Sequence, residues 1–482
     1  MKLHEAIDQV LSEAGRAMSS RELADEINRR GLYTRPSDGE PLQAKQVAAR
    51  VRRRTYRERY RIDETHRISL VANPRNEPVA PSDEEASLRG PHGWLNWYAQ
   101  QAGQPRRDAA HPESVVIHPI WEEFLLYTDA HLGGPWLELG PYEVQSLDPP
   151  GQARIGFAQR ALLLRVWDHL VDEPSRVAPA VRTDVQSYVG GDIGDEFAAL
   201  LGLTLSRRIR SGGQVRQGLP ELPSRDRGRF LSLGLPSEVL HRAPALEPPL
   251  REPMISWLSR PVSLSDAEPL LSTYPKLTGG DAVALVRAAR QYVDGLWLAD
   301  ADPRLAWIKL IGALEVAANR FDDSREESHL EQLKRHRRKL YNKLKDIPRD
   351  TAEMIAGEIV RLFNPERKLR SFIKQFDPGP PPLRPPEGPA RFDWTGLDAA
   401  IEIIYDHRSR DLHDGIAFPW MLCEPPDNHL GEMASERFYF IGMSTKGGQW
   451  VAEDLPMYLH VFAHLAGGAL RNWWASLTPQ DT

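Results

Sequence analysis

From Gly279 onward apolar residues recur at the spacing of an α-helix, and this pattern constrains the fold more than any other feature of the sequence. Residues 281–299 and 303–320 are two long segments of this kind. A strongly basic segment follows over 329–345 and keeps the same periodicity. The sequence therefore predicts a helical domain over residues 276–482.

The composition limits the class of protein. A chain of 482 residues is too long for one ordinary core, and its length predicts about three domains. Cys423 is the only cysteine, which excludes disulfide bonds within the chain and zinc sites built from cysteines. No apolar run approaches the length of a membrane span, and the first residues lack the apolar stretch of a signal peptide. We therefore expect a cytoplasmic protein.

The regions before the helical domain differ in character. Residues 1–72 predict three helices followed by two short strands that form a wing-like hairpin. Proline and charge mark residues 73–113 as a linker. Residues 114–275 give mixed signals, with helices predicted over 156–171 and 195–210. The expected fold class is mainly α, with a winged helix, a mixed α/β middle region and a C-terminal helical bundle.

Charge is distributed unevenly along the chain. Residues 1–72 contain 15 Lys or Arg against 11 Asp or Glu, a balance of +4, while the remainder carries −10. Only a local surface is therefore suited to nucleic acid. The third predicted helix presents cations suited to phosphate contacts. These are Lys45, Arg50, Arg52, Arg53 and Arg54.

Three segments of this N-terminal region, LSEAGRAMSSRELADEINRRGLY, QAKQVAARV and YRIDETHRISL, together resemble the HARE-HTH domain. That domain is a winged helix found in chromatin proteins and restriction systems. The resemblance covers about residues 3–72 and implies DNA contact through the third helix. The alternative is a winged helix that docks on protein and leaves its arginines in solvent.

The sharpest chemical pattern is YDHRSRDLHDG, residues 405–415, at the end of an amphipathic segment. Arg408 and His413 are five positions apart, so on a continuous helix their side chains diverge by about 140°. They meet around one ligand only if the helix breaks or tightens between them, or if a second subunit completes the site. Gly415 and Pro419 favour a break just beyond His413.

An arginine and a histidine without a metal suit RNA transesterification, in which a ribose 2′-hydroxyl attacks its own phosphodiester. Histidine titrates near neutral pH and can move the proton, and the arginine fork can bind the phosphate. DNA lacks this nucleophile. The alternative is a solvated helix end, in which Arg408, Arg410, Asp411 and Asp414 form ion pairs and His413 is a cap.

The pattern Arg408-x4-His413, with a polar residue after the arginine and IIYDH before it, resembles the R-x4-6-H motif of HEPN domains, closest to their ApeA-like group. The Leu-Glu pair that ends at Glu315 is similar to one in the second helix of such domains. The resemblance covers about residues 276–478. It implies a helical bundle that dimerises and cuts RNA, with Arg408 and His413 catalytic, Ser409 a polar companion and Glu315 a supporting residue.

Together these patterns predict a sensor and effector in antiphage (antiviral) defence or a toxin-like role. The winged helix would sense nucleic acid. A HEPN homodimer would act as a hydrolase of RNA without metal or cofactor, leaving a 2′,3′-cyclic phosphate. Two other classes remain open: a non-catalytic module that binds RNA or protein, and a DNA-binding regulator that dimerises through its bundle.

Three weaker signals accompany these. The basic run over 334–345 is either an RNA groove or a solvated helix face. The arginines around two glycines in 206–216 form a weak pattern for a phosphate loop, with a surface turn as the default. His460 and His464 have a spacing that can bind zinc, but no third ligand accompanies them, so we expect no metal.

Overall fold

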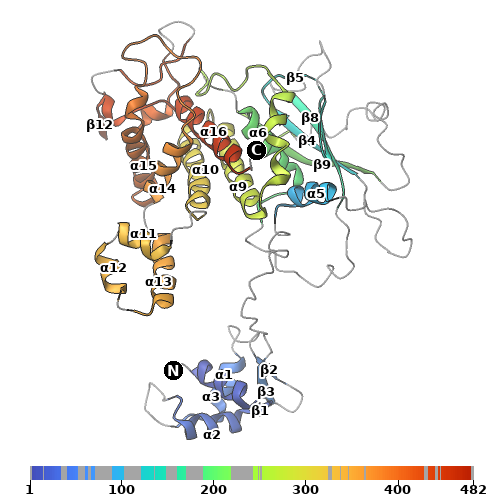
Figure 1. The fold of residues 1–482 in the computed structure, drawn as a ribbon, viewed down its shortest axis with the longest axis vertical. Helices are drawn as coiled ribbons and strands as arrows, with labels where there is room; N and C mark the ends of the chain where they lie inside the picture. Colours follow the sequence, from blue (N-terminus) through green and yellow to red (C-terminus); the bar gives the residue numbers. More distant parts are fainter. Residues whose placement is uncertain are drawn as a thin grey trace. The chain divides into compact units, whose positions relative to one another are not determined.

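The computed structural model describes residues 3–14, 16–33, 41–52, 60–62, 67–70, 90–102, 121–134, 136–147, 160–169, 188–218, 243–247, 249, 252–323, 328–336, 338–345, 347–362, 365–427, 433–439, 443–445 and 447–478. The chain divides into two compact units, Met1–Ala86 and Ser87–Thr482. The described residues are mainly helical with smaller sheets, which agrees with the coarse prediction of a mainly α chain (Figure 1). None of their helices has both the length and the apolar character needed to cross a lipid bilayer.

The described residues of the first unit form three helices and a three-stranded antiparallel sheet in the order β1-β3-β2. Its elements are α1 (Leu3–Ala14), β1 (Met18–Ser19), α2 (Ser20–Arg30), α3 (Ala44–Arg52), β2 (Tyr60–Ile62) and β3 (Arg67–Leu70). Ser19 and Glu22 cap the start of α2 by reciprocal hydrogen bonds, and Gly31 ends it with a φ of 62°. All three helices and the sheet contribute to one core.

The second unit begins with helix α5 (His92–Gln101) and a five-stranded antiparallel sheet in the order β6-β7-β8-β4-β9. The strands are β4 (Trp121–Thr128), β6 (Leu137–Leu139), β7 (Tyr142–Ser146), β8 (Arg160–Trp167) and β9 (Arg210–Gly218). The short strands β5 (Leu132–Gly133) and β10 (Val262–Ser263) pair in parallel. Helix α6 (Ile193–Leu205) packs on one face of the sheet, where Gly194 lies against the ring of Phe124 (Figure 1).

The bundle consists of α9 (Gly279–Leu298), α10 (Pro303–Asp323), α14 (Pro365–Phe376), α15 (Leu397–His413) and α16 (Leu459–Ser476). Aromatic rings fill its interior: Trp307 lies 4.9 Å from Phe462, and Phe372 lies 6.0 Å from Trp473, between ring centroids. Helices α11 (His329–His336), α12 (Arg338–Leu344) and α13 (Arg349–Leu362) pack on one another around a small core of their own. The remaining elements are α8 (Glu268–Leu271), η4 (Leu264–Ala267), η5 (Tyr274–Lys276), η6 (Trp394–Gly396), η7 (Trp420–Cys423), η8 (Ala452–Asp454), β11 (Met443–Thr445) and β12 (Gly448–Trp450).

The sheet, α6 and the bundle share one continuous hydrophobic core. Gly202 of α6 lies so close to Val293 of α9 that a Cβ at this glycine would be 2.6 Å from the valine side chain. The boundary expected at residue 275 therefore does not separate two cores. Within the expected linker 73–113, helix α5 is anchored by the buried Glu196, which accepts hydrogen bonds from the backbone N–H groups of Gly93 and Trp94 at 3.0 and 3.1 Å.

The helix predicted over 156–171 is wrong, because residues 160–167 form strand β8. This strand is buried on both faces, so its apolar residues form a continuous run instead of alternating with polar ones. The helix predicted over 195–210 corresponds to α6, which begins at a capping box between Asp192 and Asp195 and ends before β9.

Candidate functional site

The candidate site lies on α15. The buried side chains of Ile401 and Ile404 attach this helix to the bundle, and it runs without interruption from Leu397 to His413. It ends where the N–H groups of Asp414 and Ile416 both donate to the carbonyl of Arg410, with Gly415 between them at a φ of 68°. Because the helix is continuous, Arg408 and His413 of one chain point about 140° apart.

Arg408 is held by a residue of α10. Its Nη2 donates to Oε2 of Glu315 across 2.7 Å, and both side chains are largely buried, with 19% and 16% of their surface exposed. The guanidinium also lies 5.4 Å from the ring centroid of Tyr405, one turn earlier. Its Nε is buried and has no hydrogen-bond partner among the described residues. The two residues that the sequence paired by resemblance alone, Arg408 and Glu315, are thus in direct contact.

Tyr405 completes this arrangement and was missed as a site residue. Its hydroxyl donates to Oε1 of Glu315 across 3.0 Å, so the two carboxylate oxygens of Glu315 serve Tyr405 and Arg408 separately. Burial, and then the charge of Glu315, raises the pKa of Tyr405, which keeps its hydroxyl a donor. The spacing of three residues from Arg408, which places both on one helix face, is the signal that could have identified it.

A second ion pair joins the same two helices one turn further along. Asp411 is buried, and its Oδ1 accepts a hydrogen bond at 2.7 Å from Nε of Arg304, at the start of α10. Its other oxygen, Oδ2, is buried without a described partner. Helix α10 thus contributes a cation and an anion, and α15 the complementary anion and cation, which sets the register between the two helices. The exposed Arg410 pairs at 2.5 Å with Asp406 on its own helix.

His413 and Ser409 lie elsewhere on α15. The side chain of His413 is exposed in the last turn, and Ser409 is half-buried. Neither makes a side-chain hydrogen bond to a described residue. Three apolar side chains near the end of the helix are also exposed, Leu412 by 48%, Ile416 by 57% and Trp420 by 42%. One chain therefore exposes the histidine in the last turn of α15, near these apolar residues in sequence and on a different side of the helix from the arginine.

No family model, curated protein or solved structure matches the chain.

The HEPN and HARE-HTH resemblances accordingly stay predictions. For the N-terminal cations, the structure places Lys45 on the exposed side of α3 and Arg50 in a half-buried position, while Val47 and Val51 are buried. Arg52 is the last residue of α3. Arg53 and Arg54 lie outside the described residues.

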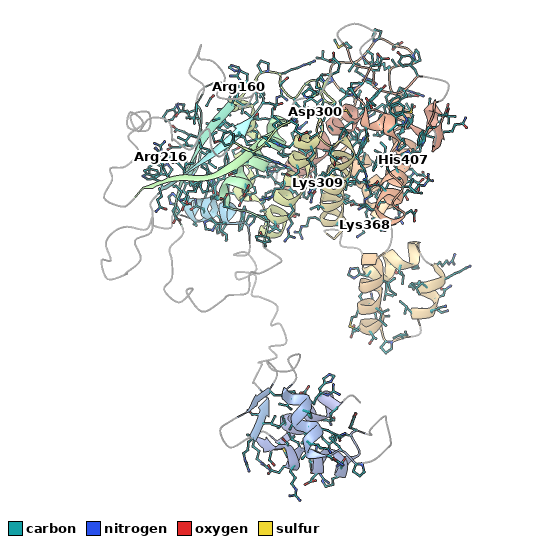
Figure 2. All side chains as sticks on the ribbon, turned by 180° about the vertical axis from the view of Figure 1, so that it is seen from behind. Arg160, Arg216, Asp300, Lys309, Lys368 and His407 are labelled. Atoms are coloured by element: carbon teal, nitrogen blue, oxygen red, sulfur yellow. The ribbon has the colours of Figure 1, made fainter. Side chains whose placement is uncertain are left out.

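The histidines considered as metal ligands are part of the packed interior. His460 is buried, burial followed by the charge of His464 lowers its pKa to about 4, and the ring of His464 hydrogen-bonds the carbonyl of Gly379. His407, adjacent to the motif arginine and labelled in Figure 2, is likewise buried and hydrogen-bonds the carbonyl of Asp454 at 2.9 Å. Among the described residues, no three His, Cys, Asp or Glu side chains gather as metal ligands would.

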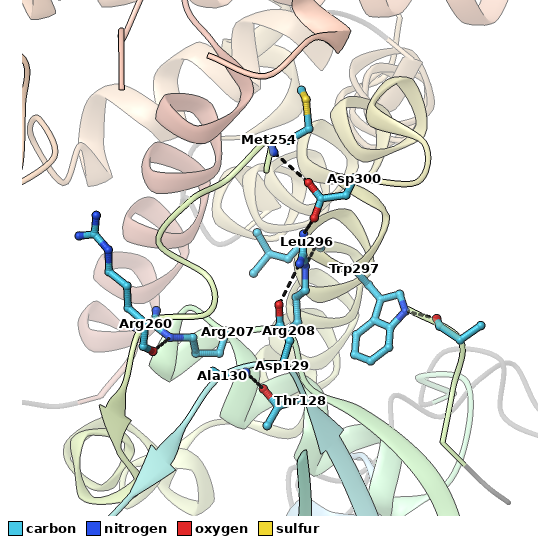
Figure 3. Close-up of polar contacts among 11 residues, drawn as sticks. Thr128, Asp129, Ala130, Arg207, Arg208, Met254, Arg260, Leu296, Trp297 and Asp300 are labelled. Carbon is cyan, nitrogen blue, oxygen red and sulfur yellow. Dashed lines mark hydrogen bonds and ion pairs between the residues drawn. The ribbon is translucent and has the colours of Figure 1, made fainter. Parts of the chain in front are cut away.

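Three of the four arginines of 206–216 form internal ion pairs, and the fourth, Arg207, donates to the backbone carbonyls of Leu205, Ser206 and Arg260. Arg208 donates to Asp129 at 2.9 Å, to Asp300 at 2.5 Å and to the carbonyl of Leu296 at 2.7 Å, joining the sheet to α9 (Figure 3). Arg210 pairs with Asp294, and Arg216 pairs with the buried Glu123. These contacts give the arginines structural roles within the fold.

Proposed function

We propose that the chain is a metal-independent endoribonuclease, with an active site that forms where the α15 helices of two copies meet. One observation supports this most: Glu315 and Tyr405 fix Arg408 on one side of α15, while His413 is exposed on another side, among exposed apolar residues. A second copy can bring its own histidine to this arginine and cover the apolar surface. In this proposal the bundle is HEPN-like and the chain is a homodimer.

The residues suit the chemistry. In the first step His413 takes the proton of a ribose 2′-hydroxyl, whose oxygen attacks the adjacent phosphorus. The bond from phosphorus to the 5′-oxygen breaks, the protonated His413 gives its proton to that oxygen, and the products are a 2′,3′-cyclic phosphate and a 5′-hydroxyl. Arginine has five N–H donors; Glu315 occupies one and the Nε–H of Arg408 is buried, so in this proposal the remaining Nη donors bind the phosphate.

The N-terminal unit fits the role of a sensor. Three helices and a small antiparallel sheet, with Lys45 exposed on α3, are compatible with a winged helix that contacts DNA. We propose that this unit responds to nucleic acid and that the RNA-cleaving end acts in antiviral defence or as a toxin.

The alternative is a bundle without activity that binds RNA or protein, or dimerises a DNA-binding regulator. The ion pair itself favours this alternative, because a guanidinium bound to Glu315 across α10 and α15 also serves as a structural link. The experiment is RNA cleavage by the purified chain in excess EDTA, compared with Arg408→Ala and His413→Ala. Cyclic phosphate ends in the wild type and loss of cleavage in both variants support the ribonuclease. Equal cleavage by all three proteins, or none by the wild type, contradicts it.

A further inference from the structure

Helices α11, α12 and α13, residues 328–362, form a basic insert in the bundle. The helices on either side of it in sequence pack directly on each other, since the ring of Phe321 in α10 lies 6.1 Å from Phe372 and 5.1 Å from Phe376 in α14. The insert has a separate core, formed by Leu333, Leu344 and nearby alanines. The contact between α10 and α14 is therefore made without the insert, whose surface is free for another role.

Hydrogen bonds and apolar contacts join the three helices of the insert to one another. Glu353 of α13 accepts hydrogen bonds from the backbone N–H groups of His329 and Leu330, at 2.5 and 3.3 Å, and so caps the first turn of α11. Leu340 and Tyr341 of α12 pack on the same small core. The inner face of α12 is thus occupied, and its outer face is polar.

That outer face is strongly cationic. Residues 334–345 contain seven Lys or Arg and no Asp or Glu. Four of the described cations on and just after α12 are exposed and form no ion pair with a described residue. They are Arg338, Lys339, Lys343 and Lys345, here called the α12 cation surface.

Like charges on one helix face repel one another. Lys339 and Lys343 are four positions apart, which makes them neighbours on the helix surface, where their like charges destabilise the helix. By contrast, the half-buried Arg370 of α14 contacts three carboxylates, those of Glu366, Asp398 and Glu402. Lys334 in α11 likewise pairs with Glu331. The α12 cation surface lacks this internal neutralisation and therefore favours an external polyanion.

We propose that the α12 cation surface binds the phosphate backbone of a single-stranded RNA and holds it for the cleavage site. The choice of RNA rests on the proposed function, whereas the phosphate contact rests on the charges alone. Each lysine–phosphate contact releases a counterion, so binding weakens as salt increases. Residues 334–345 include no Asp or Glu that would oppose a polyanion.

The test measures binding of a dye-labelled, unstructured RNA strand to the full chain carrying His413→Ala, by anisotropy over a range of salt concentrations. Lys339→Ala together with Lys343→Ala should weaken binding about tenfold and reduce the slope of log K against log salt by about 1.4, for two contacts at about 0.7 each. The matched control is Arg260→Ala with Lys276→Ala, which removes the same charge at exposed positions outside the insert.

Unchanged affinity and slope in the Lys339 and Lys343 variant would overturn the proposal and leave the surface to an acidic protein partner. An equal loss in the control pair would overturn it too. A parallel loss with a DNA strand of the same sequence supports a contact to phosphates, and a loss confined to RNA supports an added contact to the 2′-hydroxyl. Binding is measured without cleavage, so failure of the ribonuclease proposal leaves this result interpretable.

Discussion

Arg408 of α15 and Glu315 of α10 form an ion pair at 2.7 Å, and Tyr405 occupies the second oxygen of that carboxylate at 3.0 Å. The guanidinium is therefore fixed from two sides, by a charge across the helix interface and by an aromatic ring on its own helix. In the proposed ribonuclease Arg408 binds the phosphate, and electrostatic catalysis requires such a group to be fixed before the substrate arrives.

Glu315→Gln should reduce RNA cleavage more than Tyr405→Phe, because glutamine removes the charge that holds Arg408. A misplaced catalytic group costs on the order of a hundredfold in rate, and one lost hydrogen bond about fivefold. The measurement is kcat for a labelled RNA, with thermal unfolding as the control for folding. Equal rates in the wild type and both variants would show that the orientation of Arg408 does not matter for cleavage.

Arg304→Ala should lower the free energy of unfolding by about 1–2 kcal/mol, because it leaves the buried carboxylate of Asp411 without its ion-pair partner. The full cost of breaking a buried pair is not expected, since half of the Arg304 side chain is in solvent. The control is Arg410→Ala, which removes an exposed pair with Asp406 and should change stability by less than about 0.5 kcal/mol. Urea unfolding gives both values, and similar losses in the two variants would contradict this account.

Glu196 and His460 should make opposite contributions to stability in overlapping pH ranges. Burial raises the pKa of Glu196 from 4.5 to about 7, so the native state binds more protons and stability falls as pH rises through that window. Burial lowers the pKa of His460 from 6.5 to about 4, so the unfolded state binds more protons and stability rises between those values. Glu196→Gln should therefore gain stability relative to wild type from pH 4.5 to 7, by about 3 kcal/mol. His460→Gln should become less stable relative to wild type as pH rises from 4 to 6.5, because only the wild type gains stability over this range. Urea unfolding across this range measures both effects. A difference in unfolding free energy between variant and wild type that does not change with pH would contradict the shifted pKa values.

Lys45→Ala should weaken binding of the chain to duplex DNA and reduce the salt slope by about 0.9, the value for one phosphate contact. The matched control is Arg29→Ala on α2, whose side chain pairs with Glu26 at 2.6 Å. Electrophoretic or anisotropy titrations at several salt concentrations measure the slope. Identical behaviour of both variants and the wild type would exclude α3 as a DNA-contacting helix.

The sequence predicted the helical segments well where periodicity and caps agree. Helix α2 begins at the capping box of Ser19 and Glu22 and ends at Gly31, all readable as local signals. Strand β8 was predicted as a helix because a strand buried on both faces has no alternation. Helix α5 was missed for a different reason: the buried Glu196, more than ninety residues later, caps it.

The candidate site was predictable only in part. The resemblance placed Arg408 and Glu315 in one site, and they are in contact. The contact of Arg304 with Asp411 depends on how two distant segments pack, and no local pattern encodes it. The spacing of Arg408 and His413 left open whether the helix breaks between them, and the continuous α15 places them on different sides of the helix within one chain.

Mixing two inactive variants tests the central claim most directly. If each site takes Arg408 from one copy and His413 from the other, Arg408→Ala and His413→Ala are both inactive alone. Co-folded in equal amounts, they should recover about a quarter of the wild-type rate of RNA cleavage, because about half of the dimers pair unlike chains and each of these has one intact site. Failure to recover any cleavage, with dimers present and the wild type active, would contradict a site shared between two copies.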